Sequence, residues 1–193
     1  MKICVFGAAS PNIDYEYIEK VEQLGIEMVK RGHSLVFGGG GHGLMGAAAR
    51  GVHSAGGKIL GVLPKFFDEN NVEVLCGFCD ELIKPDTMRE RKQIMEDNSD
   101  AFIVVPGGIG TFEEFFEILT LKQLCRHNKP IVIYNIKGYY EELIHSIDKA
   151  IEKGFIRKTC KDLYLTTDNV DEIFRYIELP PDHIHTVKEL KDG

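Results

Sequence analysis

The sequence predicts an α/β protein with a doubly wound parallel sheet in a single domain. Short apolar runs of strand length alternate with longer runs in which apolar residues recur near the helical period. Two of the apolar runs end in glycine clusters, at residues 38–46 and 107–110, that lead directly into helix-like segments. Ligands of a doubly wound sheet lie at the carboxyl ends of its strands, so both glycine clusters are expected at the ligand site.

The predicted elements follow one another without an internal linker. Strands are predicted at residues 2–7, 34–37, 58–63, 101–105, 129–134 and 163–166. Helices are predicted at residues 13–30, 47–56, 87–99, 111–124, 139–153 and 168–177. Residues 66–75 fit no single pattern, and extended structure is expected within residues 72–84. Residues 1–179 are expected to form the domain, and residues 180–193 a polar, frayed tail.

The length and the charge of the chain narrow the function classes. At 193 residues, with 44% hydrophobic and 27% charged residues, the chain suits one globular domain with a well-buried core. No apolar stretch reaches membrane-spanning length and Met1 leads directly into a strand-like run, so a cytoplasmic protein without membrane contact is expected. The formal net charge of −7 disfavours nucleic acid as a partner but allows a small phosphorylated ligand.

The cysteines and histidines show no complete metal or redox motif. The five cysteines stand at positions 4, 76, 79, 125 and 160, an odd number that indicates a reducing compartment. Cys76 and Cys79 have C-x-x-C spacing, but a zinc ribbon needs a second such pair and a thioredoxin-like site needs a helix start. His183 and His185 lie in the polar tail and are expected to be solvated. No metal and no cofactor is therefore expected.

The glycines at 107, 108 and 110 follow a predicted strand and precede a predicted helix. Backbone N–H groups in such a turn have no carbonyl partner, and glycines let an anion approach them closely. Because most glycine turns only reverse the chain, the spacing alone leaves a phosphate site and a plain turn open. The cluster at 38–46 lacks the lysine of the P-loop motif, yet two phosphate-sized turns in one small domain favour a phosphorylated ligand.

A charged residue stands on the apolar stripe of the helix that begins at Thr87. Thr87 and Glu90 have the spacing of a capping box. The stripe of this helix passes through Ile94 and Met95, and Arg91 falls between them. A guanidinium on a core-facing stripe is costly unless it meets an anion, either a carboxylate or a ligand phosphate. The alternative is that Arg91 extends to the surface with its stem against apolar neighbours.

Two motifs together resemble those of the LOG ("Lonely guy") family. Residues 106–114 fit the pattern P-G-G-x-G-T-x-x-E, and residues 88–92 fit M-x-x-R-K. The resemblance extends over about residues 1–178. LOG proteins are cytokinin riboside 5′-monophosphate phosphoribohydrolases that were once labelled lysine decarboxylases. The older label gains no support, because the chain has no recognisable lysine motif for pyridoxal phosphate.

The resemblance implies a Rossmann-like enzyme that hydrolyses the N-glycosidic bond of adenosine 5′-monophosphate, plain or N6-substituted, to free base and ribose 5-phosphate. It also implies that Arg91 and Glu114 are the catalytic pair. The family's nucleotide-contacting positions fall on Lys92, Gly107, Gly108, Gly110, Thr111 and Thr120. Further substrate-binding candidates, beside these motifs or at strand ends, are Ser10, Gly40, Gly41, Gly43, Met88 and Ile109. Arg89 stands where many relatives have His, which leaves the base preference open.

A homodimer is expected both from the resemblance and from surplus apolar residues. The predicted helices 87–99 and 110–126 carry more apolar residues than one sheet face needs, which favours a self-complementary seam. The residues counted as surplus are Phe115, Phe116, Ile118, Leu119 and Leu121.

The role of Glu114 and the function of the protein each have alternatives that stay open. Thr111 and Glu114 have capping-box spacing, so the residues alone favour Glu114 as a cap of its own helix, whereas the resemblance favours catalysis. The same superfamily contains non-catalytic carriers of phosphorylated cofactors such as molybdenum cofactor, and a nucleotide sensor would need similar loops. A carrier needs no carboxylate beside the sugar, so the presence of both Arg91 and Glu114 favours the hydrolase.

Overall fold

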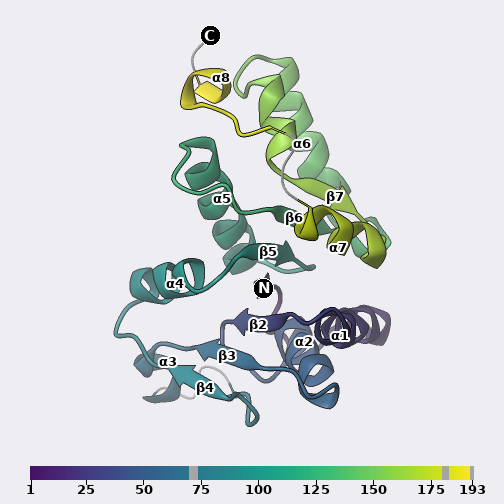
Figure 1. Cartoon of the computed structure of the whole chain (residues 1–193), viewed down its shortest axis with the longest axis vertical. Coiled ribbons are helices and arrows are strands. Elements are labelled where there is room, and N and C mark those ends of the chain that lie inside the picture. Colours follow the sequence, from purple (N-terminus) through teal and green to yellow (C-terminus); the bar gives the residue numbers. More distant parts are fainter. Residues whose placement is uncertain (70–73, 180–182, 192–193) are drawn as a thin grey trace.

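The computed structural model describes residues 1–69, 74–179 and 183–191. These residues build one parallel sheet with the strand order β4-β3-β2-β1-β5-β6-β7 (Figure 1). The strands are β1 (Lys2–Phe6), β2 (Ser34–Phe37), β3 (Ile59–Val62), β4 (Glu81–Ile83), β5 (Ala101–Val104), β6 (Ile131–Tyr134) and β7 (Leu165–Thr167). The order reverses between β1 and β5, which confirms the doubly wound α/β fold and places its crevice at the carboxyl ends of these two strands.

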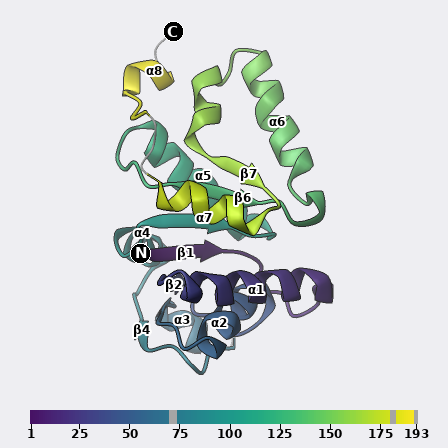
Figure 2. The same cartoon turned by 45° about the vertical axis from the view of Figure 1, so that its right-hand side comes forward.

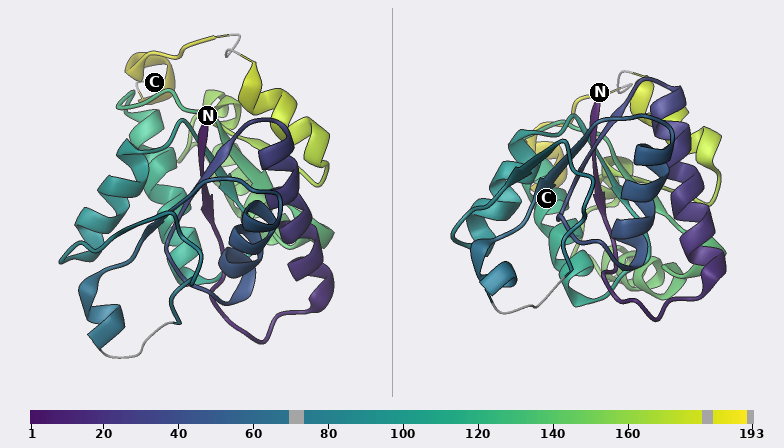
Figure 3. Two further views of the ribbon diagram at one scale, coloured as in Figure 1. Left: turned by 60° about the horizontal axis from the view of Figure 1, so that its bottom comes forward. Right: turned by 90° about the horizontal axis from the view of Figure 1, so that it is seen from below.

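Helices cover both faces of the sheet (Figures 1 and 2). They are α1 (Tyr15–Lys30), α2 (Gly43–Ser54), α3 (Lys65–Glu69), α4 (Met88–Asp97), α5 (Ile109–Gln123), α6 (Glu141–Glu152), α7 (Val170–Glu178) and α8 (Val187–Lys191), with the 3-10 helices η1 (Ile136–Gly138) and η2 (Lys158–Leu163). One layer, formed by α1, α2 and α7, buries residues such as Leu24 and Ile173. The other layer, formed by α4, α5 and α6, buries Phe115 and Ile147. Figure 3 shows helices on either side of the sheet, and none of the described helices is long and apolar enough to cross a membrane.

The central strand β1 contributes to both apolar layers. Ile3 and Val5 pack with the α1 layer, whereas Cys4 and Phe6 pack with the α5 layer. None of the four is more than 4% exposed. Successive strand residues point to opposite faces, so a strand covered on both sides reads as a continuous apolar run, as these residues do.

Small residues bring α1 and α2 into close contact. A Cβ added to Gly51 would lie 2.0 Å from the carbonyl oxygen of Glu22, and one added to Gly25 would lie 2.5 Å from that of Ala48. Both distances are far below van der Waals contact, so only glycine fits at these positions. The small residues of α2 therefore serve its tight packing against α1.

Two helices begin earlier than the sequence predicts. α2 begins at Gly43 rather than at residue 47, and α5 begins at Ile109 rather than at Thr111. In both cases no side chain of the described residues caps the first turn, so the glycine-rich sequence gives no signal of the helix start. Of the unassigned segment 66–75, residues up to 69 belong to α3, and residues 70–73 lie outside the described residues.

The expectation of a frayed tail is wrong for residues 187–191, which form α8. Leu190 is 1% exposed and packs against Cys160 and Leu163. A single apolar side chain in a polar segment thus docks the helix onto the domain. Residues 180–182 and 192–193 lie outside the described residues, and the domain boundary at residue 179 stays a prediction.

Candidate active site

Arg91 and Glu114 form a buried ion pair at the carboxyl end of the sheet. Arg91 on α4 is 6% exposed and Glu114 on α5 is 7% exposed. Nη1 of Arg91 donates a hydrogen bond of 2.8 Å to Oε1 of Glu114. Nε of Arg91 donates to the carbonyl oxygen of Val62, the last residue of β3, at 3.2 Å. Arg91 therefore meets a carboxylate inside the protein, and the alternative that it extends to the surface is wrong.

The capping box at the start of α4 fixes where Arg91 stands. The backbone N–H of Glu90 donates to Oγ1 of Thr87 at 3.2 Å, and the N–H of Thr87 donates to Oε2 of Glu90 at 3.1 Å. Both hydrogen bonds of the predicted capping box are present. A fixed helix start sets which face of α4 points inward, and Arg91 lies on that face.

The first glycine cluster packs against the same guanidinium. A Cβ added to Gly38 would lie 2.1 Å from Nη2 of Arg91. Any side chain at this position would displace the guanidinium from Glu114. The glycine after β2 thus makes room for the ion pair.

Glu114 does not cap its helix. α5 begins at Ile109 with Gly108 as its N-cap, so Glu114 is the sixth residue of the helix, beyond the reach of a capping box. Its carboxylate accepts a hydrogen bond from Arg91. The capping interpretation of Glu114 is therefore wrong, because it assumed a helix start at Thr111.

The electrostatic surroundings make Glu114 a more basic carboxylate. Burial raises the pKa of the Glu114 carboxyl above its ordinary value, and the Arg91 guanidinium opposes this rise. A carboxylate with a raised pKa accepts a proton more readily, which suits a group that deprotonates or orients water.

The glycine turn after β5 opens in front of the N-terminus of α5. A Cβ added to Gly108 or Gly110 would meet nothing within 4 Å, and Ile109 is 87% exposed. No side-chain cap hydrogen bond occurs at this helix start in the described residues. Thr111 is buried, and a Cβ on Gly107 would lie 2.1 Å from its Oγ1. The first-turn N–H groups are thus left for an anion, in the geometry by which helix N-termini bind phosphate.

The other glycine turn is partly occupied by the protein itself. The N–H of Gly41 donates to the carbonyl oxygen of Val74 at 2.7 Å, and Gly40 bridges Leu75. Gly43 has a φ of +59°, and a Cβ there would lie 2.4 Å from the carbonyl oxygen of Ala8. Of the two candidate phosphate turns, only the one after β5 presents an open helix start.

A pocket of about 190 Å³ lies where the two halves of the sheet meet. The loops around it are joined by backbone hydrogen bonds, from Leu44 to Ala8 at 2.8 Å and from Ala8 to Pro106 at 3.1 Å. Its lining residues are Ala8, Ser10, Ile13, Tyr17, Leu44, Pro106, Gly107, Gly108 and Tyr139. The candidates Ser10, Gly107 and Gly108 thus share one mostly apolar pocket.

Sequence reasoning missed the two tyrosines of this pocket. The hydroxyl of Tyr139 donates to the carbonyl oxygen of Gly107 at 2.8 Å, and the rings of Tyr17 and Tyr139 meet edge to face at 6.4 Å between centroids. Tyr139 follows β6 at its carboxyl end, the edge where ligands of this fold bind. Its place after a predicted strand was the signal that could have found it.

Three candidates lie apart from the buried pair in the described residues. Lys92 forms ion pairs with Glu113 and, at 2.7 Å, with Glu117, so it links the outer surfaces of α4 and α5. Met88 at the start of α4 is 39% exposed, and Thr120 on α5 is exposed. The expected contact of these three residues with substrate stays a prediction.

A doubly wound α/β protein with an open glycine turn at its topological switch point is of the Rossmann-like, nucleotide-binding class. Residues 45–177 match the family model described as "Possible lysine decarboxylase". The chain belongs to this family, and within it to the LOG proteins, because its curated relatives are similar over nearly its whole length.

Two of these relatives come from Arabidopsis thaliana. The cytokinin riboside 5′-monophosphate phosphoribohydrolase LOG7 is 40% identical over 177 residues, which cover 92% of this chain and 81% of the relative. The corresponding enzyme LOG2 is 37% identical over 177 residues, which cover 92% of this chain and 82% of the relative.

Solved structures with the same fold include the molybdenum cofactor binding protein from Rippkaea orientalis. It matches with a TM-score of 0.69 at 21% identity, over 92% of this chain and 94% of that one. The Moco carrier protein from Chlamydomonas reinhardtii matches with a TM-score of 0.68 at 22% identity, over 92% and 94% of the two chains. At this identity the likeness concerns the fold alone.

Proposed function

We propose that the protein hydrolyses the N-glycosidic bond of adenosine 5′-monophosphate or its N6-substituted derivatives, releasing free base and ribose 5-phosphate. The observation that carries the proposal is the buried Arg91–Glu114 pair, whose carboxylate comes from the same helix, α5, that begins at the open glycine turn. The activity named for relatives at 37–40% identity supports it. Incubation with a panel of nucleoside monophosphates, followed by chromatography for free base, tests the reaction and measures the base preference.

The chemistry of the bond explains why these groups are needed. Breaking the bond between C1′ and the base builds positive charge on the ribose and negative charge on the base. Glu114 stabilises the ribosyl cation or orients the attacking water, and its raised pKa makes it the stronger base for that task. Arg91 holds the carboxylate in place through their hydrogen bond. The N–H groups at the start of α5 bind the 5′-phosphate.

Removal of the 5′-phosphate is expected to lower kcat/KM by about a hundredfold or more. Each charge-assisted hydrogen bond contributes about 1.5 to 3 kcal/mol, and adenosine forgoes at least two of them at the turn 107–110. Steady-state rates of base release from adenosine and from its monophosphate measure this ratio. Ribose 5-phosphate is expected to compete with the nucleotide, whereas ribose is not. Equal turnover of the two substrates would contradict a phosphate site.

The rival function is a carrier or sensor that binds without turnover. The solved structures of cofactor carriers share the fold, so the fold cannot separate the two functions. A buried carboxylate paired with Arg91 is the feature that a carrier does not need. Binding of nucleotide without release of base would favour the carrier.

We further propose that the protein is a cytoplasmic homodimer that pairs through α4 and α5. Met88, Ile109 and Phe116 are large apolar residues that stay 39%, 87% and 40% exposed on these helices. Of the residues counted as surplus in the sequence, Phe115 and Ile118 belong to the core instead, at 1% and 3% exposed. Phe116 is therefore the residue on which a seam would depend.

Replacement of Phe116 by Glu is expected to turn a dimer into a monomer. A charge in an apolar seam must be desolvated without a partner, which costs several kcal/mol. Sedimentation equilibrium at micromolar concentration measures the mass of the wild type and of the variant. Phe155→Glu is the matched control, because Phe155 is 86% exposed on another part of the surface. A monomeric wild type would contradict the seam.

A further inference from the structure

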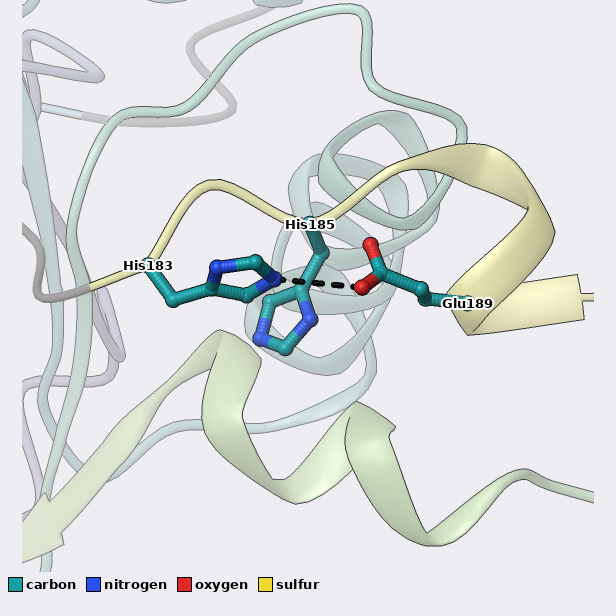
Figure 4. Close-up of side chains that lie close together, drawn as sticks. All are labelled: His183, His185 and Glu189. Atoms are coloured by element: carbon teal, nitrogen blue, oxygen red, sulfur yellow. Dashed lines mark hydrogen bonds and ion pairs between the residues drawn. The ribbon is translucent and has the colours of Figure 1, made fainter.

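Two histidines and a glutamate meet at the C-terminal end of the described chain, outside the active site. One ligand atom from each of His183, His185 and Glu189 lies within 4.8 Å of the other two. Figure 4 shows the side chains of His183 and Glu189 directed toward each other, with the ring of His185 beside them. The sequence predicted that the two histidines are solvated and did not indicate this cluster. The turn before α8 is what brings Glu189 close to them.

The spacing of these atoms resembles that of ligands around one metal ion. Nε2 of His183 lies 3.3 Å from Oε1 of Glu189. Two ligands bound to zinc at about 2.0–2.2 Å in tetrahedral geometry stand about 3.3–3.5 Å apart. As an exposed ion pair, the same contact would contribute little to stability.

The segment that carries these side chains is held on the domain. Oγ1 of Thr159 donates to the backbone carbonyl oxygen of Glu189 at 2.8 Å, and Leu190 is buried next to it. Sγ of Cys125 donates to the carbonyl oxygen of His185 at 3.2 Å. The cluster thus stands on anchored backbone on both sides of the turn.

Further contacts orient the carboxylate and one imidazole. Oε2 of Glu189 accepts hydrogen bonds from the N–H of Thr186 at 2.6 Å and from its hydroxyl at 2.9 Å, which leaves Oε1 facing the histidines. Nε2 of His185 lies 3.8 Å from Oδ2 of Asp162. A histidine that binds metal usually turns its other ring nitrogen toward a carboxylate.

We propose that His183, His185 and Glu189 bind one divalent transition-metal ion of the zinc class, with solvent in the remaining position. Two imidazole nitrogens and one carboxylate oxygen suit zinc, nickel or copper, whereas calcium and magnesium prefer oxygen ligands alone. The ion joins residues on either side of the turn at Thr186 and so fixes this turn at the start of α8. It takes no part in the proposed hydrolysis, since none of its ligands belongs to the active site.

Calorimetric titration of the chelator-treated full-length protein with Zn²⁺ tests the site. One ion per chain is expected, together with a higher melting temperature. The double variant His183→Asn/His185→Asn is expected to bind Zn²⁺ at least about a hundredfold more weakly than the wild type. Glu189→Gln keeps an oxygen for the cap at Thr186 but removes the charge, so it is expected to weaken binding by at least about tenfold while α8 stays docked.

Two matched controls separate this site from other zinc-binding groups. His145→Asn removes an exposed histidine of α6 and is expected to leave the affinity unchanged. Cys76→Ser/Cys79→Ser removes the closely spaced pair of free thiols, which is the competing zinc-binding group away from this site, and the ion is expected to bind still. Loss of binding in the cysteine variant, wild-type affinity in the double histidine variant, or no binding by the wild type would overturn the proposal.

Discussion

Replacement of Glu114 by Gln is expected to lower kcat by about a hundredfold or more and to change KM little. The substitution keeps the shape and an oxygen that accepts a hydrogen bond from Arg91, but it removes the negative charge that faces the developing ribosyl cation. The phosphate contacts at the turn 107–110 are made already in the ground state and are untouched. A loss confined to kcat identifies an interaction that forms in the transition state.

Glu113→Gln is the matched control for this prediction. Glu113 is the neighbouring residue on α5, but its carboxylate pairs with Lys92 and is 54% exposed, so the same change there is expected to alter kcat by less than about threefold. Rates are compared well below the melting temperature of each variant, so that unfolding does not contribute. Unchanged turnover of Glu114→Gln would return Glu114 to a purely structural role.

The pH dependence of the wild type gives an independent view of the same carboxylate. The reaction needs Glu114 in its charged form, so kcat/KM falls as the pH falls through the pKa of this group in the free enzyme. Burial raises this pKa, and the acid limb is therefore expected above the ordinary value for glutamate of about 4.3. If titration of Glu114 causes this fall of kcat/KM at low pH, the acid limb of the profile disappears or moves in Glu114→Gln.

Local sequence signals predicted the fold well, because they depend on short-range physics. The capping box of Thr87 and Glu90 set the start of α4, and the apolar run 34–37 gave the bounds of β2. The starts of α2 and α5 were misplaced, since glycines after a strand provide no capping side chain to mark the first turn. Helix α8 was missed because a single buried residue, Leu190, docks it.

The candidate active site could be predicted only in part, because it depends on contacts between segments that are far apart in the sequence. The stripe on α4 left two possibilities for Arg91, an anion inside the protein or extension to the surface. Which of them holds, and with which partner, depends on how α4 and α5 pack on one face of the sheet. No periodicity along the chain carries that information, and the pairing with Glu114 came from the resemblance to a family. Tyr17 and Tyr139 were missed because their loops meet only at the switch point of the finished sheet.

Replacement of Arg91 by Met is expected to destabilise the protein and to abolish most of its activity. The variant leaves the carboxylate of Glu114 buried without a cation, which costs about 3–5 kcal/mol and corresponds to a fall in melting temperature of roughly 10 °C. Loss of the guanidinium also raises the pKa of Glu114 further, so that the carboxyl stays protonated to a higher pH than in the wild type. Arg126→Met, a change of the same chemistry at an exposed residue, is expected to alter neither quantity.

The double variant Arg91→Met/Glu114→Leu decides why the pair is buried at all. Apolar residues of similar volume often replace a buried ion pair at no cost, so this variant is expected to recover most of the stability that Arg91→Met loses. It is expected to stay inactive, since the carboxylate is gone. Thermal unfolding and base release measured on the same samples give both quantities. Recovered stability without activity means that the pair is kept for chemistry, whereas a double variant less stable than either single one would mean that the pair holds the fold.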